Sequence, residues 1–94
     1  ALRLDPTLAD AHINMGVALA SQGKISDAMP YFSEAVRLKP DLEIARLNLA
    51  RALAALGHRE DAIRQLREAL QLNPASTQAR AMLDELLKKT SFAA

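Results

Sequence analysis

The chain has 94 residues, of which 50% are hydrophobic and 24% are charged, and its formal net charge at pH 7 is +1. A chain of this length forms at most one small domain. The near-balance of 12 basic and 11 acidic residues argues against a nucleic-acid binder, because such a protein needs a basic surface to displace counterions from phosphates. The lack of cysteine excludes disulfides, thiolate nucleophiles and cysteine-ligated zinc.

The types of apolar residue predict helices. The sequence contains 19 Ala and 16 Leu, but only three aromatic residues. Ala and Leu are strong helix formers, whereas the β-branched and aromatic residues that favour strands are scarce. We therefore expect an all-α protein. Its apolar runs are far shorter than the roughly 20 residues needed to span a bilayer, so we expect no membrane association.

The N-terminus carries neither an initiator Met nor a signal-peptide pattern. We therefore expect the chain to be a fragment of a longer protein, with a cytoplasmic location. Its eight Arg against four Lys, together with the abundant Ala, are typical of a GC-rich bacterial source.

An internal repeat of 34 residues organises the sequence. Pro6, Pro40 and Pro74 stand 34 residues apart. Residues 7–40 aligned with 41–74 give 13 identities in 34 positions without a gap. Such agreement is not a chance event, so we interpret the chain as a tandem array.

Proline and glycine divide the first repeat into two expected helices. The first is predicted at about 8–22, with Gly23 as the left-handed residue that ends it. The second is predicted at about 25–38 and ends before Pro40, which cannot continue a helix. Pro30 lies inside this second helix, where we expect an exposed and tolerated interruption of the hydrogen bonding.

Proline and glycine divide the second repeat in the same way. Asp41 is expected to cap a helix that runs to about Leu56, and Gly57 is expected to end it. A further helix is predicted over 59–72, and the remaining apolar pattern predicts a last helix over 75–90. Short connections make consecutive helices antiparallel neighbours.

The residues at these positions resemble the tetratricopeptide repeat, whose pattern is large-x-x-Leu-Gly-x-x-Tyr, then Ala-x-x-x-Phe, then Pro. The first copy matches the pattern at His12, Met15, Gly16, Leu19, Ala28, Phe32, Ala35 and Pro40. The corresponding residues of the second copy are Arg46, Leu49, Ala50, Leu53, Ala62, Leu66, Ala69 and Pro74. A third half-copy has Arg80, Leu83 and Leu87 at these positions but departs from the pattern at Asp84. The resemblance implies a right-handed α-solenoid of antiparallel helix pairs.

The repeat phase divides the single domain into a tail of a preceding repeat, two whole repeats, and a capping helix with its tail, at 1–6, 7–40, 41–74 and 75–94. Asp84 occupies the position of the small residues Gly16 and Ala50, where burial of an unpaired carboxylate is costly. We therefore expect Asp84 to be exposed and the last helix to be a C-terminal cap. At the other end, an uncovered apolar face predicts end-to-end self-association of the fragment.

Neither histidine belongs to a pattern that indicates catalysis. His12 occupies a packing position of the repeat, and His58 follows the turn glycine, where we expect it to be exposed. No metal-binding pair, phosphate loop or nucleophile motif is present, so we expect no enzymatic activity, no metal and no cofactor.

The resemblance implies that the first helices of successive pairs line a concave surface for a peptide or protein partner. The inward-facing residues would be Asp10, Ile13, Asn14, Val17, Ser21, Ile44, Leu47, Asn48, Arg51, Ala55, Gln78, Met82 and Glu85. Their mixture of apolar, amide and single cationic side chains suits an extended or helical peptide. We therefore expect a non-catalytic scaffold for protein–protein interaction.

Asn14 and Asn48 occupy equivalent positions in the two repeats. An asparagine can both donate to and accept from a peptide backbone, and repeated Asn resembles the asparagine ladder of O-linked N-acetylglucosamine transferases. The alternative function is therefore an accessory, substrate-recruiting region of a larger enzyme such as a glycosyltransferase. The alternative role for the asparagines themselves is structural, namely a hydrogen bond to a neighbouring helix.

Chaperone-binding members of the family hold a C-terminal carboxylate with a clamp of Lys, Asn and Arg side chains. In this chain the clamp positions carry Ile13, Val17, Asn48, Gln78 and Met82. Only Asn48 matches, and a carboxylate without its cations loses the charge-assisted bonds that give affinity. We therefore expect that the chain lacks this clamp.

Overall fold

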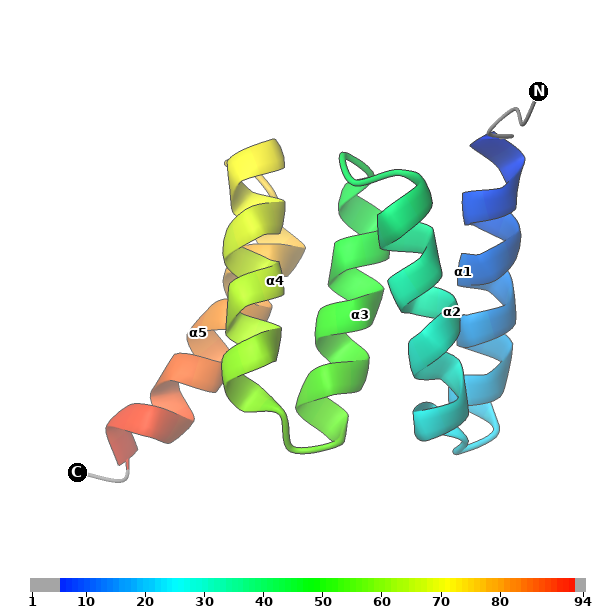
Figure 1. The fold of residues 1–94 in the computed structure, drawn as a ribbon. Helices are drawn as coiled ribbons and strands as arrows, with labels where there is room; N and C mark the ends of the chain where they lie inside the picture. The colour runs from blue at the N-terminus through cyan, green and yellow to red at the C-terminus, as the bar shows by residue number, and fades with distance from the viewer. Residues whose placement is uncertain (1–5, 93–94) are drawn as a thin grey trace.

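The structure is a computed structural model that describes residues 6–92, and these form five α-helices (Figure 1). Their bounds are α1 Pro6–Ser21, α2 Ile25–Leu38, α3 Glu43–Ala55, α4 Arg59–Leu72 and α5 Thr77–Phe92. The prediction of an all-α fold is confirmed. None of the helices in this part of the chain has the length and apolar character needed to cross a membrane.

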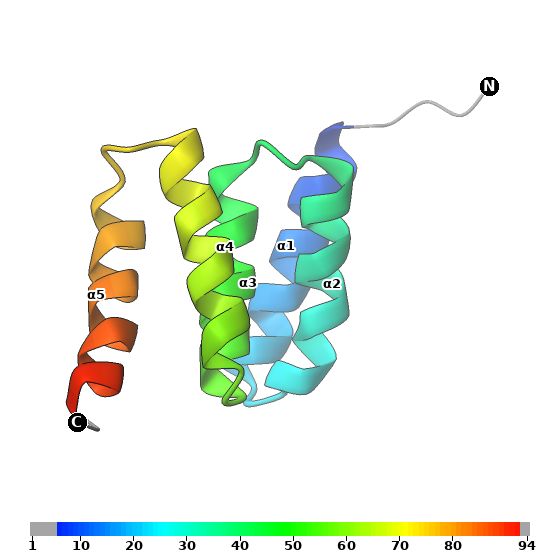
Figure 2. The ribbon, with the colours of Figure 1, turned by 60° about the vertical axis from the view of Figure 1, so that its left-hand side comes forward.

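The helices pack in chain order as antiparallel pairs. Each helix contacts the next one, and α3 also contacts α1 and α5 directly. In Figure 2, α2 and α4 lie in front of α1 and α3, so the pairs form two layers. Within the described residues, contacts join only near neighbours in the chain, which is the arrangement of a linear repeat array.

The turns between helices have the glycine and proline positions that were predicted to end the helices. Gly23 has φ of 82° and Gly57 has φ of 88°, the left-handed conformation that ends α1 and α3. Lys39 and Asn73, which precede the repeat prolines, lie outside the helical conformation, with φ of −135° and −143°. Pro30 lies inside α2 and is exposed, as expected.

The predicted cap of α3 by Asp41 is wrong. The backbone N–H of Leu42 donates to the carbonyl oxygen of Lys39 at 3.0 Å and closes a turn through Pro40 and Asp41. The helix begins only at Glu43, and no side chain caps it. Because proline holds the chain in this turn, Asp41 lies too early to reach the first helical N–H groups.

The last helix also begins later than predicted, at Thr77. The backbone N–H of Ala79 donates to the Ser76 hydroxyl at 3.2 Å, so Ser76 caps α5, which the sequence analysis overlooked. Asp84 is exposed, as expected. The predicted tail of a preceding repeat lies outside the described residues, apart from Pro6, which begins α1.

The core alternates bulky and small side chains between the layers. Phe32 and Leu66, equivalent in the two repeats, are buried, and alanines such as Ala28 and Ala62 let neighbouring helices approach closely. A polar contact also ties α3 to α4, because Arg46 forms an ion pair with Glu68 at 2.6 Å. This packing fixes the relative positions of α1, α2 and α3, between which the candidate site lies.

Candidate functional site

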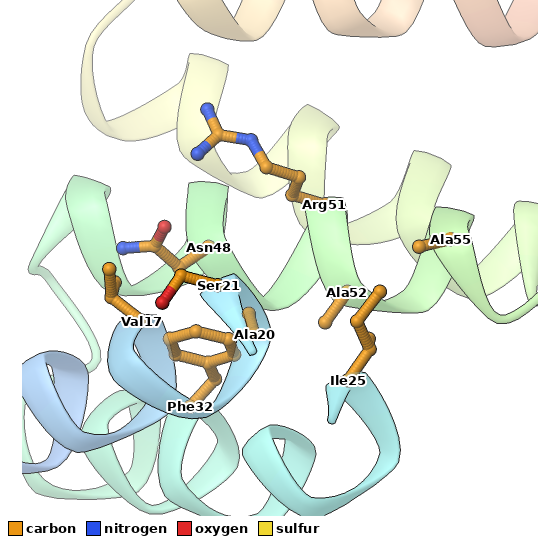
Figure 3. Close-up of a pocket in the computed structure, with 9 residues that line it drawn as sticks. All are labelled: Val17, Ala20, Ser21, Ile25, Phe32, Asn48, Arg51, Ala52 and Ala55. Atoms are coloured by element: carbon orange, nitrogen blue, oxygen red, sulfur yellow. The ribbon is translucent and has the colours of Figure 1, made fainter. Parts of the chain in front are cut away.

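A pocket of about 330 Å³ opens between α1, α2 and α3 (Figure 3). The nine residues that line it are Val17, Ala20, Ser21, Ile25, Phe32, Asn48, Arg51, Ala52 and Ala55. Its size falls at the lower end of the range of small-ligand sites, which suits one side chain with its peptide group.

Helix geometry explains why these residues meet. The four residues from α3, at 48, 51, 52 and 55, follow the i, i+3, i+4, i+7 spacing of one helix face. The turn at Gly23 reverses the chain, so Ile25 at the start of α2 lies beside the end of α1. The site is therefore built from two repeats and depends on how they stack.

The Phe32 ring forms the floor of the pocket. This side chain is only 2% exposed, and it packs against the backbone of Gly16 on α1. A Cβ atom placed on Gly16 would lie 2.5 Å from Cε1 of the ring, which is closer than real contacts allow. Glycine at this position therefore lets the aromatic ring fit between α1 and α2, where it faces the pocket.

Asn48 is the most unusual residue of the site. It is only 7% exposed, yet its amide forms no hydrogen bond with any residue that the structure describes. In Figure 3 this amide lies with Val17 and Ser21 at one end of the pocket. Among the described residues, the fully enclosed polar side-chain atom without a partner is Nε of Arg59, so the amide atoms of Asn48 are open to the pocket and can bond to a molecule in it.

The other polar lining residues differ in whether their hydrogen-bonding groups are already used within the fold. The Ser21 hydroxyl donates to the carbonyl oxygen of Ala18 at 2.9 Å, so its proton is already used within α1. Arg51 is exposed and forms no ion pair or hydrogen bond with a described residue. No carboxylate lines the pocket, so its electrostatic character is positive.

The structure brings together five of the residues predicted for the concave surface. Val17, Ser21, Asn48, Arg51 and Ala55 all line the pocket. Their repeat register was the signal that located them.

The other predicted residues do not join them. Ile13 and Leu47 belong to the buried core and do not line the pocket, and Met82 is half-buried against the core. The remaining five are exposed away from the pocket: Asp10, Asn14, Ile44, Gln78 and Glu85.

Four lining residues were not predicted from the sequence: Ala20, Ile25, Phe32 and Ala52. Ile25 and Phe32 come from α2, whereas the predicted concave surface consisted of first helices alone. The pairing of Gly16 with an aromatic residue at the repeat's bulky position was an available signal, because a ring larger than the second repeat's leucine extends further toward the surface.

The two asparagines do not form the expected pair. Asn14 is exposed and lies outside the pocket, whereas Asn48 is buried within it. Neither forms a hydrogen bond with a neighbouring helix among the described residues, so the structure does not contain the alternative, purely structural pairing either. The difference arises because α3 has helices on both sides, whereas α1 is the first helix described.

The histidines occupy structural positions. His12 Nδ1 lies 2.7 Å from the carbonyl oxygen of Leu8, and its ring centroid lies 6.0 Å from that of Tyr31. His58 is exposed in the turn, as expected. In the described part of the chain, no group of three His, Cys, Asp or Glu residues is arranged to hold a metal ion.

The array of antiparallel helices and its inter-repeat pocket define the chain as a helical repeat protein. A family model described as tetratricopeptide repeat matches residues 19–86, which is more than half of the sequence. The chain belongs to the tetratricopeptide repeat family.

Several solved structures share this fold, among them tetratricopeptide domains. The second such domain of Spaghetti (RPAP3), bound to an HSP90 peptide, matches with a TM-score of 0.87 at 16% identity, over 92% of this chain and 80% of that one. The first domain of the same protein, bound to the same peptide, gives 0.85 at 23% identity, over 93% and 71%. The MamA RS-1 ArsTM double mutant gives 0.83 at 22% identity, over 87% and 46%. A comparison with curated protein sequences finds no match.

Proposed function

We propose that this chain is a non-catalytic peptide-binding module, whose ligand inserts into the pocket between α1, α2 and α3. The observation that supports this proposal most directly is the amide of Asn48, which opens into the pocket and has no hydrogen-bond partner among the described residues. An amide can donate to a peptide carbonyl and accept from a peptide N–H at once. A ligand's main chain would thus satisfy the bonding that the fold leaves open.

The proposed ligand is an internal peptide segment rather than a chain terminus. The RPAP3 domains of similar fold hold HSP90 and HSP70 peptides. In this chain the clamp positions 13, 17, 78 and 82 carry no cation, and Ile13 is buried. Recognition would therefore depend on the apolar floor of the pocket and on the polar side chains that line it.

The proposal is tested by peptide selection and a pair of matched variants. A library of displayed random peptides is selected on the chain, and the affinity of an enriched peptide is measured by fluorescence anisotropy. Asn48→Ala should weaken binding about tenfold, because a ligand hydrogen bond contributes roughly 1–1.5 kcal/mol. Asn14→Ala makes the same change at the equivalent, exposed position and should leave the affinity unchanged.

Stability separates a functional asparagine from a structural one. Because Asn48 has no hydrogen-bond partner among the described residues, Asn48→Ala should leave the free energy of unfolding unchanged or slightly higher. A loss of stability above about 1 kcal/mol would show that the amide is used in folding. Failure of the chain to enrich any peptide would overturn the proposed function.

A further inference from the structure

The pocket combines an apolar floor with one free cation at its edge, and this combination bears on what kind of peptide it takes. The present inference rests on the proposed peptide-binding function. Arg51 lies one helical turn after Asn48 on the same face of α3, and both line the pocket. A ligand that reaches the buried amide therefore passes the guanidinium group.

Arg51 differs from the arginines that stabilise the fold. Arg37, Arg46 and Arg64 each form an ion pair with a glutamate or aspartate. Arg51 has no such partner among the described residues, and Glu85, at the equivalent position of α5, makes no ion pair with it. The Arg51 guanidinium thus keeps all of its donors for an anion from outside.

The opposite side of the site is apolar. The Phe32 ring forms its floor, Val17 is 46% exposed at its rim, and Ile25 and Ala52 lie at its other end (Figure 3). These groups gain free energy when they cover an apolar side chain, but they offer nothing to a charged one. A ligand must therefore present an apolar and an anionic group close together.

We infer that the pocket recognises a peptide segment in which a large apolar residue lies next to an acidic one. The apolar side chain lies over Phe32, its peptide group bonds to the Asn48 amide, and the neighbouring carboxylate pairs with Arg51. Arginine suits this role because its planar donors match the two oxygens of a carboxylate. The acidic group distinguishes this ligand from the purely apolar peptides that the floor alone would accept.

The test compares peptide selections on three forms of the full chain: wild type, Arg51→Glu, and Arg67→Glu as the matched control. Arg67 is also exposed and forms no ion pair within the described residues, but it lies outside the pocket. The displayed peptides have no free C-terminus, so only side chains can supply the carboxylate. As a folding control, circular dichroism is used to check that each variant keeps its helical melting transition.

Wild type and Arg67→Glu should both enrich peptides with Asp or Glu within two positions of a large apolar residue. Arg51→Glu should keep the apolar preference and exchange the acidic preference for a basic one. For a peptide enriched on wild type, replacement of its acid by the corresponding amide should weaken binding about tenfold, since charged hydrogen bonds contribute roughly 1.5 kcal/mol or more. The same replacement should have no effect on binding to Arg51→Gln.

The possible failures are distinguishable. Enrichment of apolar peptides without an acidic preference would overturn this inference and leave the proposed function standing. An acidic preference that persists in Arg51→Glu would show that another group binds the carboxylate, and would also overturn the inference. If no form enriches a peptide, the proposed function fails and this inference fails with it.

Discussion

The pair Gly16 and Phe32 shows how a single residue sets the spacing of two helices. The second repeat places Ala50 and Leu66 at the same positions, so each repeat combines one smaller and one larger partner in a complementary way. Both bulky residues are buried between the layers. The first repeat therefore gains its aromatic pocket floor only because glycine stands opposite.

We expect Gly16→Ala to lower the free energy of unfolding by about 1 kcal/mol. The new methyl group would meet the buried Phe32 ring, and overpacking of this kind costs roughly 1–3 kcal/mol. The higher helix propensity of alanine offsets only about 1 kcal/mol of this cost. Urea denaturation followed by circular dichroism measures the difference.

Phe32→Leu supplies the control, because Gly16→Ala combined with it recreates the pair Ala50 and Leu66 of the second repeat. In the Phe32→Leu background the alanine should cost nothing or should stabilise the protein. If Gly16→Ala alone is as stable as the wild type, the ring moves into the neighbouring pocket without a penalty, and the complementary-size argument is wrong.

At the scale of the helices, the positions at which they end depend on a few conformational constraints. Gly57 has φ of 88°, and a Cβ atom at this residue would find open space within 4 Å. Any cost of substitution there is therefore conformational and not due to a clash with neighbouring side chains.

Gly57→Ala should lower the free energy of unfolding by about 1–2 kcal/mol, the usual penalty for a left-handed alanine. Gly57→Asn should cost less, because asparagine adopts this conformation more readily. Thermal melting of the two variants measures the order. Equal losses would mean that the turn changes its conformation when glycine is removed.

Glu43 joins the start of α3 to the loop between α4 and α5. Hydrogen bonds from the Ser76 hydroxyl and from the Asn73 side-chain amide, the latter at 3.0 Å, lower the pKa of the Glu43 carboxyl below its usual value of 4.5. A group with a lowered folded-state pKa stabilises the fold fully above its unfolded-state pKa. This contribution is lost as the pH falls through the folded-state pKa.

Wild type should therefore lose more stability than Glu43→Gln when the pH falls from 6 to 3, with a difference below about 1 kcal/mol at this partly exposed site. Urea denaturation at several pH values measures it. Glu85→Gln is the matched control, because Glu85 is exposed and forms no bond with a described residue. Identical pH profiles for wild type and Glu43→Gln would contradict the assigned network.

On the scale of the whole molecule, the outer face of α1 is apolar and uncovered. Leu8 is 43% exposed and Met15 is 47% exposed. Their equivalents in the second repeat are Leu42, just before α3, and Leu49 on α3, which are half-buried and buried respectively. Residues that one repeat buries are thus open to solvent in the other.

We expect this chain to self-associate through the α1 face at high concentration, as measured by sedimentation velocity. Met15→Glu should make it monomeric, because a charge on this face cannot be buried without a partner. Ile44→Glu changes a similarly exposed apolar residue, 45% exposed on α3, and should leave association unchanged. A wild-type chain that is monomeric at millimolar concentration would contradict the prediction.

We propose that α5 acts as a cap, and the same measurement tests this. Asp84 is exposed on α5, and Leu87 is 38% exposed on the same helix. If α5 is a cap, Leu87→Glu should leave self-association unchanged. A monomeric Leu87→Glu variant would show that α5 is itself a contact surface.

The sequence by itself determined the helices and their order. Proline and left-handed glycine act locally, so Pro40 and Gly57 fixed the helix ends without reference to the rest of the fold. The exceptions were Asp41, where the turn after proline left the expected cap too far from the helix, and the start of α5, which begins at Thr77 after the Ser76 cap. The repeat register also located Val17 and Arg51 in the site, because register places equivalent residues on one face.

Only the tertiary structure decided which of these residues can meet a ligand. Asn14 and Asn48 are equivalent in sequence, but only Asn48 lies where three helices enclose it, and burial is a property of the packing. The same packing removed Ile13 and Leu47 from the surface and brought Phe32 from a second helix into the pocket. Local patterns fix where a side chain lies on its own helix, whereas the neighbouring helices determine whether it is exposed, paired or open to a partner.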